Sequence, residues 1–345
     1  MRIQYHVLLY ILVTAFLVLP MATLAETRTI TDVAGNTIDI PSDVTRIVTV
    51  DPFTSQFLFV IGADDKLVGT CIGPANRNLV NVTEPSLGAL PSAGCKTSVN
   101  LEELLSLNPD LVISANTYTQ VNEDIKRANI PVVIVDVEKP DNLIKSYELL
   151  GKIVGKEKEA QDFISYYNEK MEIVKKNADG ITDSDKKRVY FGQREPLSTL
   201  GDDYYEAKIA AMAGGKNVAE GVSGGDNKVT IDQVYTWNPD LVVLLPYNSK
   251  SVSELLADPA WQSLPAVQNK QVYRMPKYLM SWELPVPESI LGTLWLQSTM
   301  YPDKVRFNLT DEIKGFYKKF YRLDMTDEDV AALLKDQTPV ILNKS

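Results

Sequence analysis

An internal repeat constrains the fold of this chain more strongly than any other sequence feature. Residues 99–104 and 108–113 recur as residues 229–234 and 238–243, at a constant offset of 130 positions. In each copy an amphipathic helical pattern stops at Asn-Pro-Asp, because proline disfavours helical geometry in the residue before it, and a β-branched apolar strand follows. We therefore expect two equivalent helix-turn-strand units, one in each of two lobes.

Apolar strand-like segments alternate with helical stretches in both halves of the chain. They span residues 46–50, 111–115 and 131–135 in the first half, and 188–191, 241–245 and 271–275 in the second. Such strands imply parallel sheets that are covered on both faces. About 320 residues follow the N-terminal segment, more than a single hydrophobic core usually holds. The predicted fold class is therefore α/β, with two lobes of mainly parallel sheet covered by helices.

A helical linker is expected between the two lobes. Apolar residues recur at helical spacing from Lys156 to Ala178, and this pattern predicts one long amphipathic helix of roughly 35 Å. The resulting domain prediction is an N-terminal lobe over 26–140, a helical linker over 141–187 and a C-terminal lobe over 188–345. A single helical crossing predicts a stiff hinge and modest closure.

The N-terminal residues 1–25 have the pattern of a secretory signal peptide. An apolar run from Val7 to Leu19 lies behind Arg2 and ends in small residues up to Ala25, after which we expect cleavage. A retained anchor is the alternative, but the run of ~13 residues is shorter than the roughly 20 that span a bilayer as a helix. The chain is therefore expected to be exported, to a periplasmic or cell-surface location.

The chain contains two cysteines, Cys71 and Cys95. Both follow the predicted signal, so they would enter a compartment in which disulfides persist, and we expect them to pair. A metal site with two thiol ligands is the alternative. The sequence itself does not decide between them.

Net charge and histidine content exclude several classes of function. The formal charge of −10 argues against a nucleic acid partner, which requires a basic surface. The single histidine, His6, lies inside the predicted signal, so the mature chain would have no imidazole to ligate a metal or act as a base. We predict no protein-held metal and no cofactor.

Several ordered segments together resemble a known family. They are Asp32-Val33-Ala34-Gly35-Asn36, the two Asn-Pro-Asp units, Asp258-Pro259-Ala260-Trp261 with Val272-Tyr273, and Phe316 to Tyr321 ahead of Leu323 to Glu328. Nearly all of the mature chain resembles the periplasmic-binding-protein family of ABC importers for iron-siderophore, haem and cobalamin. The resemblance implies two α/β lobes joined by one long helix, with the ligand held in the cleft between them and delivered to a permease and its ATPase.

Within this resemblance a ferric siderophore is the favoured ligand. Free zinc and manganese carriers of the related group usually depend on histidines, so a pre-chelated metal fits this chain better. Cobalamin, haem, another metal chelate and an oxyanion such as molybdate remain open as alternatives. We expect the protein to act as a monomer.

Segments that follow strands are the candidates for the ligand site, because ligands of open α/β sheets bind beyond the carboxyl ends of the strands. The predicted ligand-binding residues are Phe53, Thr54, Tyr118, Arg194, Tyr278, Trp282 and Glu283. The guanidinium of Arg194 could grip a carboxylate or catecholate through two parallel hydrogen bonds; its alternative role is a structural pair with Glu195 or another acid. The aromatic side chains could stack on a flat ligand, or a tyrosine oxygen could ligate ferric iron; simple packing is their alternative.

The resemblance also implies one acidic docking residue on each lobe, which would pair with arginines of the permease. Glu102 matches that position in the first lobe, and the aligned Asp232 is one methylene shorter. The alternative is an acid that merely stabilises a helix N-terminus through the helix dipole.

Two rival functions come from other classes. An enzyme could use Glu283 and Glu288 as an acid-base pair, but the chain contains no nucleophile elbow, phosphate loop or histidine cluster. A surface adhesin or sensor could use the same duplicated fold without transport. We expect no catalysis.

Overall fold

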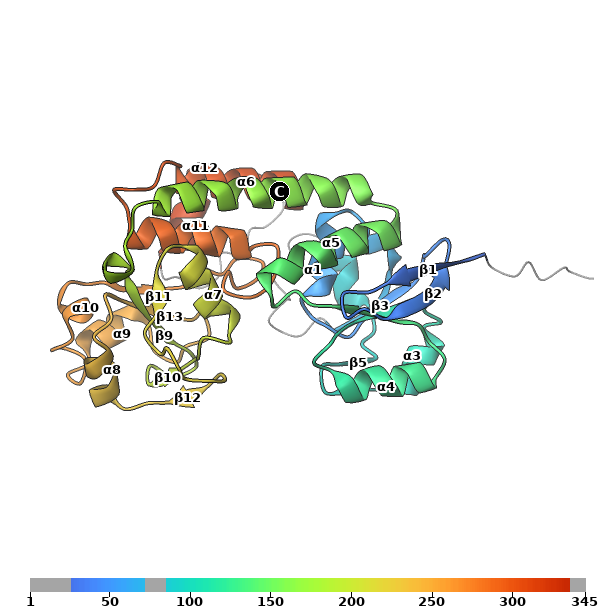
Figure 1. Cartoon of the computed structure of the whole chain (residues 1–345), viewed down its shortest axis with the longest axis horizontal. Helices are drawn as coiled ribbons and strands as arrows, with labels where there is room; N and C mark the ends of the chain where they lie inside the picture. The colour runs from blue at the N-terminus through green and yellow to red at the C-terminus, as the bar shows by residue number, and fades with distance from the viewer. Residues whose placement is uncertain (1–25, 72–84, 336–345) are drawn as a thin grey trace, which may run out of the picture.

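The computed structural model describes residues 26–71 and 85–335 and shows two α/β lobes side by side (Figure 1). Each lobe contains one four-stranded sheet, and every pair of neighbouring strands in both sheets is parallel. The N-terminal sheet has the order β4 (Leu67–Thr70), β3 (Ile47–Thr49), β7 (Leu111–Ala115) and β8 (Val132–Val135). The C-terminal sheet has the order β11 (Lys216–Asn217), β9 (Arg188–Gly192), β13 (Leu241–Leu244) and β14 (Val272–Arg274). The predicted fold class is confirmed.

Further elements surround these sheets. The short strands are β1 (Thr27–Thr31), β2 (Thr37–Pro41), β5 (Gly94–Cys95), β6 (Ser98–Val99), β10 (Ser198–Thr199) and β12 (Asn227–Lys228). The helices include α1 (Thr54–Val60), α3 (Leu101–Ser106), α4 (Thr119–Arg127), α5 (Pro140–Val154), α6 (Glu157–Ala178), α7 (Tyr205–Met212), α8 (Ile231–Trp237), α9 (Val252–Ala257), α10 (Pro265–Gln268), α11 (Ser289–Met300), α12 (Leu309–Tyr321) and α13 (Asp327–Leu334).

The two copies of the repeat form the same turn. They are α3 with β7 in one lobe and α8 with β13 in the other, and each helix is followed by an asparagine with left-handed backbone geometry, at φ 44° for Asn108 and φ 45° for Asn238. Asparagine tolerates this geometry better than most residues. The asparagine therefore ends each helix, and the proline that follows it in the sequence prevents the helix from continuing.

In each lobe an arginine and an aspartate attach the turn to a strand of the sheet. The strand is β3 in the N-terminal lobe and β9 in the C-terminal lobe. A side-chain oxygen of Asp110 accepts hydrogen bonds from the backbone N–H groups of Thr45 and Arg46, at 2.7 and 2.8 Å. The Arg46 guanidinium donates in return to the carbonyl oxygen of Leu107 at 2.6 Å. In the other lobe Asp240 accepts from the N–H of Arg188 at 2.8 Å, and the Arg188 guanidinium donates to the Trp237 carbonyl. The repeat thus encodes one tertiary clamp, made twice.

The long helix α6 runs along one side of both lobes, close to its predicted bounds (Figure 1). Its apolar face is buried, and the Phe163 ring lies edge-on to Phe57 of α1, Tyr147 of α5 and Phe320 of α12, with ring centroids 5.7, 5.3 and 5.0 Å away. Towards its end, Asn177 donates to Gln297 of α11 at 3.0 Å. The helix is therefore anchored in both lobes.

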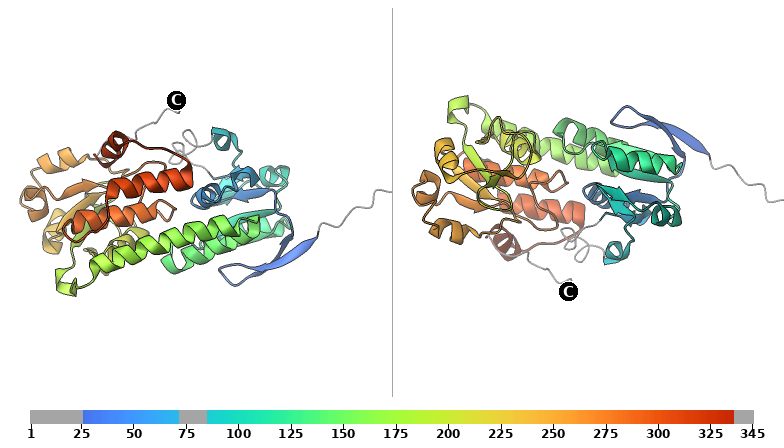
Figure 2. Two further views of the ribbon diagram at one scale, coloured as in Figure 1. Left: turned by 90° about the horizontal axis from the view of Figure 1, so that it is seen from above. Right: turned by 90° about the horizontal axis from the view of Figure 1, so that it is seen from below.

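A second element also bridges the lobes, which sequence reasoning missed. Helix α12 lies beside α6 and reaches the N-terminal lobe (Figure 2), where the Tyr321 ring stacks on Phe59 of α1 at a centroid distance of 5.9 Å. Lys170 of α6 pairs with Glu312 of α12 at 2.8 Å, and both side chains are largely buried. Because one apolar core continues through both lobes and these helices, large hinge motions would break it. The structure supports a stiff pairing of the lobes.

The described residues, 26–71 and 85–335, include no helix that is long and apolar enough to cross a membrane. The predicted signal peptide lies outside these ranges.

The two clamps predict a stability effect. Asp110→Ala and Asp240→Ala should each lower the free energy of unfolding by about 0.5–1.5 kcal/mol, because each removes the carboxylate that accepts hydrogen bonds from the backbone N–H groups at the start of the adjoining strand. The two losses should add in the double variant, since the sites lie in different lobes. Urea unfolding measures both, with the exposed Asp43→Ala as control. Losses no larger than that of the control would contradict the clamp.

Candidate functional site

A cavity of about 140 Å³ lies between the lobes at the carboxyl ends of the N-terminal strands. Its N-terminal wall contains Asp51 and Phe53 after β3, residues 115–117 after β7 and residues 135–139 after β8, and the C-terminal lobe contributes Asp203 and Lys208. The Lys208 ammonium donates to the backbone carbonyl of Glu138 at 2.9 Å and so links the two walls. The site lies where open α/β sheets place their ligands.

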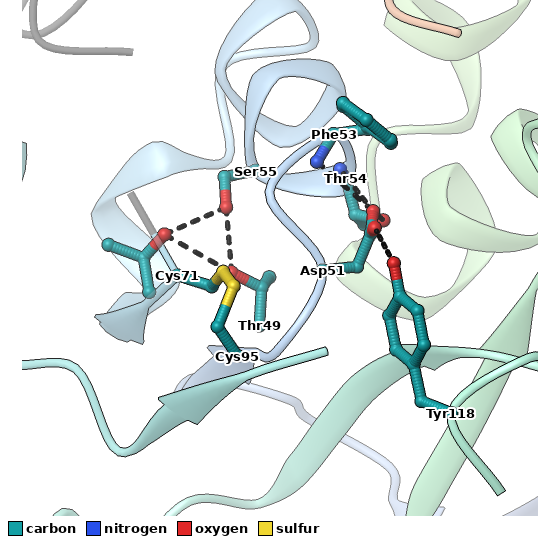
Figure 3. Close-up of a disulfide and its surroundings, with 9 residues drawn as sticks. Thr49, Asp51, Phe53, Thr54, Ser55, Cys71, Cys95 and Tyr118 are labelled. Atoms are coloured by element: carbon teal, nitrogen blue, oxygen red, sulfur yellow. Dashed lines mark hydrogen bonds between the residues drawn. A yellow bond between two sulfur atoms is a disulfide. The ribbon is translucent and has the colours of Figure 1, made fainter. Parts of the chain in front are cut away.

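Asp51 organises the N-terminal wall (Figure 3). It is buried, and one carboxylate oxygen accepts from the N–H of Phe53 at 3.1 Å and from the N–H and hydroxyl of Thr54 at 2.9 and 2.7 Å. Its other oxygen accepts from the Tyr118 hydroxyl at 3.1 Å. Three predicted site residues therefore meet at one carboxylate, which the sequence reasoning did not select.

These contacts change the expected roles of Thr54 and Tyr118. Thr54 is buried and its hydroxyl is committed to Asp51, so it shapes the wall rather than facing the cavity. Burial raises the pKa of the Tyr118 hydroxyl, and the charge of Asp51 raises it further. A phenolate ligand for ferric iron is therefore disfavoured at Tyr118 in this arrangement. Phe53, by contrast, lines the cavity directly.

Arg194 follows β9 in the C-terminal lobe and is exposed. Its guanidinium carbon lies 5.9 Å from the centre of the Tyr247 ring. The predicted alternative, a pair with Glu195, is not formed, because Glu195 accepts a hydrogen bond from the Ser249 hydroxyl instead. Within residues 26–71 and 85–335 no carboxylate makes an ion pair with Arg194. Arg194 therefore has no ion-pair partner among the described residues, and it is not one of the residues that line the cavity.

Tyr247 and Tyr204 are among the most exposed large apolar side chains of the described structure, at 43% and 39%. Although much of the Tyr247 side chain is exposed, partial desolvation raises the pKa of its hydroxyl, and the carboxyls of Glu283 and Glu206 raise it further. Sequence reasoning missed both tyrosines. The repeat could have found Tyr247, because it follows β13 at the position that Thr117 occupies after β7.

Tyr278 and Trp282 lie in the core and do not face the cavity, contrary to the stacking role predicted for them. They are 2% and 0% exposed. The Trp282 indole N–H donates to the Tyr317 hydroxyl at 3.1 Å, and the Tyr278 ring lies edge-on to Tyr317 with centroids 4.9 Å apart. Tyr317 of α12 thus contacts both side chains, which fits the alternative role of simple packing.

The remaining acidic candidates are buried. Glu288 accepts from the Tyr317 hydroxyl and, at 2.7 Å, from the Met280 N–H, and burial raises its pKa to about 8. Glu283 is fully buried, and neither of its carboxyl oxygens receives a hydrogen bond from the described residues. Burial raises the pKa of Glu283 well above its ordinary value, with a further contribution from Glu206. Neither glutamate is open to a ligand in this conformation, which argues against the acid-base pair.

The two docking candidates occupy equivalent places. Glu102 lies in the first turn of α3 and Asp232 in the first turn of α8, and both are exposed. The two helices lie on the side of their lobes opposite α6 (Figure 1). Neither carboxylate makes an ion pair with any described residue. Both acids are thus available to a partner.

The two cysteines are joined in a disulfide, with Cα atoms 5.2 Å apart (Figure 3). The described residues contain no cluster of acidic, cysteine or histidine side chains that could hold a metal ion.

A family model described as periplasmic binding protein matches residues 47–279. The chain belongs to this family. Periplasmic binding proteins similar to it include the molybdate-binding protein MolA of Haemophilus influenzae, 26% identical over 91% of this chain and 96% of that protein. The iron(3+)-hydroxamate-binding protein YxeB of Bacillus subtilis is 25% identical over 72% of this chain and 77% of its own length. A solved ABC transporter solute-binding protein from Sulfurospirillum deleyianum superimposes with a TM-score of 0.82 at 26% identity, covering 89% of this chain and 99% of that one.

These findings establish the general function. The chain is a substrate-binding protein of an ABC importer, and its relatives are solute-binding proteins and not enzymes. They do not support the preference for a ferric siderophore over other ligands, because the match to the molybdate-binding relative is the more extensive one.

The buried carboxyl of Glu206 predicts a pH effect on stability. Burial raises its pKa from 4.5 to about 7, so between these values the folded protein keeps a proton that the unfolded chain has lost. Its contribution to stability is therefore present below about pH 4.5 and is lost as the pH rises through about 7. Between pH 5 and 7.5 this group lowers the free energy of unfolding of the wild type. In Glu206→Gln that decrease should be smaller by roughly 1–3 kcal/mol.

Urea unfolding at several pH values measures this difference. The exposed Glu220→Gln serves as the matched control and should leave the wild-type pH dependence unchanged. Parallel curves for Glu206→Gln and the wild type would contradict the prediction.

Proposed function

We propose that this periplasmic binding protein captures an anion in its inter-lobe cleft, most specifically a small oxyanion of the molybdate type, and presents it to the permease of its importer. The observation that carries the proposal is the unpaired Arg194. A planar guanidinium without a counter-charge offers two parallel N–H donors to an oxyanion. The buried carboxyls of Glu283 and Glu206 act electrostatically on the adjacent Tyr247, and burial raises the pKa of each of them.

The size of the cavity favours a small ligand. Its volume of about 140 Å³ is below the roughly 300–1,000 Å³ typical of pockets for larger organic ligands. The extensive similarity to a molybdate-binding relative points to the same ligand class. An oxyanion also needs no histidine or other metal ligand from the protein, which agrees with the composition of the mature chain.

An anionic ferric chelate is the second candidate. Tyr204 and Tyr247 are exposed aromatic side chains on the C-terminal lobe, and such rings can pack against the organic body of a chelator. The similarity to an iron(3+)-hydroxamate-binding relative supports this reading. Titration with molybdate, tungstate, sulfate, ferric citrate, a ferric hydroxamate, haem and cobalamin separates the two candidates. Saturable binding of cobalamin alone would contradict both.

Arg194→Ala should weaken the binding of the anion identified in that panel by about 10- to 100-fold, because it removes a charged hydrogen-bond donor. Isothermal titration calorimetry measures the dissociation constant. Arg306→Ala, which removes an exposed arginine from the same lobe, should have no effect. An unchanged affinity in Arg194→Ala would exclude Arg194 from the site.

We further propose that Glu102 and Asp232 dock the loaded protein on the permease. We also propose that residues 1–25 direct the export of the chain, and that the exported protein is a monomer. Glu102→Ala should reduce ligand uptake at least several-fold and leave ligand affinity unchanged, because Glu102 is exposed on α3 and is not among the residues that line the cavity. Uptake into vesicles that carry the permease and ATPase measures the effect. Glu123→Ala, an exposed acid on α4, is the control; equal uptake by both variants would overturn the docking role.

A further inference from the structure

A tight hairpin next to the cleft places one lysine in a defined position. The hairpin joins β5 to β6, and its turn residue Lys96 has left-handed backbone geometry at φ 36°. Gly94 has φ 130°, and a side chain there would come within 2.3 Å of the Ser98 carbonyl oxygen. The close approach of the two strands therefore requires glycine, and the backbone around Lys96 is fixed by its neighbours.

Two links tie this hairpin to the strand that carries Asp51. The backbone N–H of Lys96 donates to the carbonyl oxygen of Val50 at 3.1 Å. The disulfide joins the adjacent Cys95 to Cys71, whose own N–H donates to the Thr49 carbonyl at 3.0 Å. The hairpin is thus attached on both sides of the end of β3.

The surroundings of the disulfide are polar and buried (Figure 3). The hydroxyls of Thr49, Ser55 and Thr70 bond to one another at 2.7 to 3.2 Å. All three side chains are buried. This hydroxyl cluster connects β3, α1 and β4 beside the disulfide.

The side chain of Lys96 ends against a residue of the cavity wall, although Lys96 itself is not among the residues that line the cavity. Its ammonium nitrogen lies 4.6 Å from the centre of the Phe53 ring, and Phe53 lines the cavity. Lys96 is partly exposed and forms no ion pair with any residue of the described ranges. A cation-π contact orients an ammonium without neutralising its charge. The charge remains available to a ligand.

We propose that Lys96 is the anion anchor of the N-terminal lobe, and that the Cys71–Cys95 disulfide holds it in place for binding. The proposal rests on the anionic ligand proposed above and adds the second half of its site. Each lobe then supplies one unpaired cation held over an aromatic ring, Lys96 over Phe53 and Arg194 over Tyr247. An anion between the lobes would be gripped from both sides.

Substitution of Lys96 tests the anchor. The probes are sodium molybdate, sodium tungstate and ferric citrate, and the protein is the chain from residue 26 onward. Lys96→Gln should lower the affinity for the anion that binds best by at least tenfold. It should also make this affinity less dependent on salt concentration. Lys96→Arg, which keeps the charge, should stay within about threefold of the wild type. Lys126→Gln, at an exposed lysine of the same lobe, is the matched control and should change nothing.

A double-mutant cycle tests the role of the disulfide. Cys71→Ser with Cys95→Ser should weaken anion binding by a factor similar to that of Lys96→Gln. Addition of Lys96→Gln to this background should weaken it by less than about twofold further, because both changes remove the same positioned charge. Circular dichroism monitors folding. If the cysteine variant fails to fold, the affinity of the wild-type protein before and after reduction replaces it.

The outcomes separate the two proposals. If the wild-type protein binds an anion and Lys96→Gln binds it equally well, the anchor is overturned and the anion-binding function stands. If Lys96→Gln and the cysteine variant weaken binding by independent factors that multiply, the disulfide does not act through Lys96. If the wild-type protein binds none of the three anions, both proposals fail.

Discussion

The aromatic cluster around Phe163 sets the relation between the two lobes, and the rest of the site depends on it. Phe163 of α6 packs against rings of α1, α5 and α12. This single buried side chain therefore connects the linker helix to the N-terminal lobe and to α12. Because the apolar core continues into the other lobe, the cleft has a fixed back wall. A wide opening would expose this core to water, at a cost that rises with the apolar area uncovered.

The ionisable groups at and around the cleft have different roles, which depend on their burial and their partners. Asp51 receives four hydrogen bonds and serves as the framework of one wall. Glu206 and Glu283 are removed from water, which raises their pKa values and favours the neutral form. The cation Lys96 is partly exposed and Arg194 is exposed, and neither forms an ion pair with a described residue. The electrostatic balance at the cleft therefore depends less on the number of acids than on which of them are buried.

The family fold explains transport but leaves the ligand open. Relatives with the same two lobes bind molybdate or an iron(3+)-hydroxamate, so the fold supplies a cleft and a docking side, and a few side chains choose the ligand. In this protein we propose that those side chains come from segments after strands and from the disulfide-linked hairpin. A change of a single cation in such a cleft would alter selectivity without affecting the sheets.

Sequence alone determined the α/β class, the duplicated Asn-Pro-Asp unit and the long helix, because hydrophobic periodicity and turn chemistry are local properties. It also brought Phe53, Tyr118 and Arg194 forward, since they follow strands. Only the tertiary structure decided that Tyr278 and Trp282 are covered by α12, that Thr54 is bonded to Asp51, and that Lys96 lies over Phe53. Those outcomes depend on contacts between residues far apart in the chain, such as Trp282 with Tyr317 and Cys71 with Cys95. Local periodicity contains no information about which distant side chain will cover a given one.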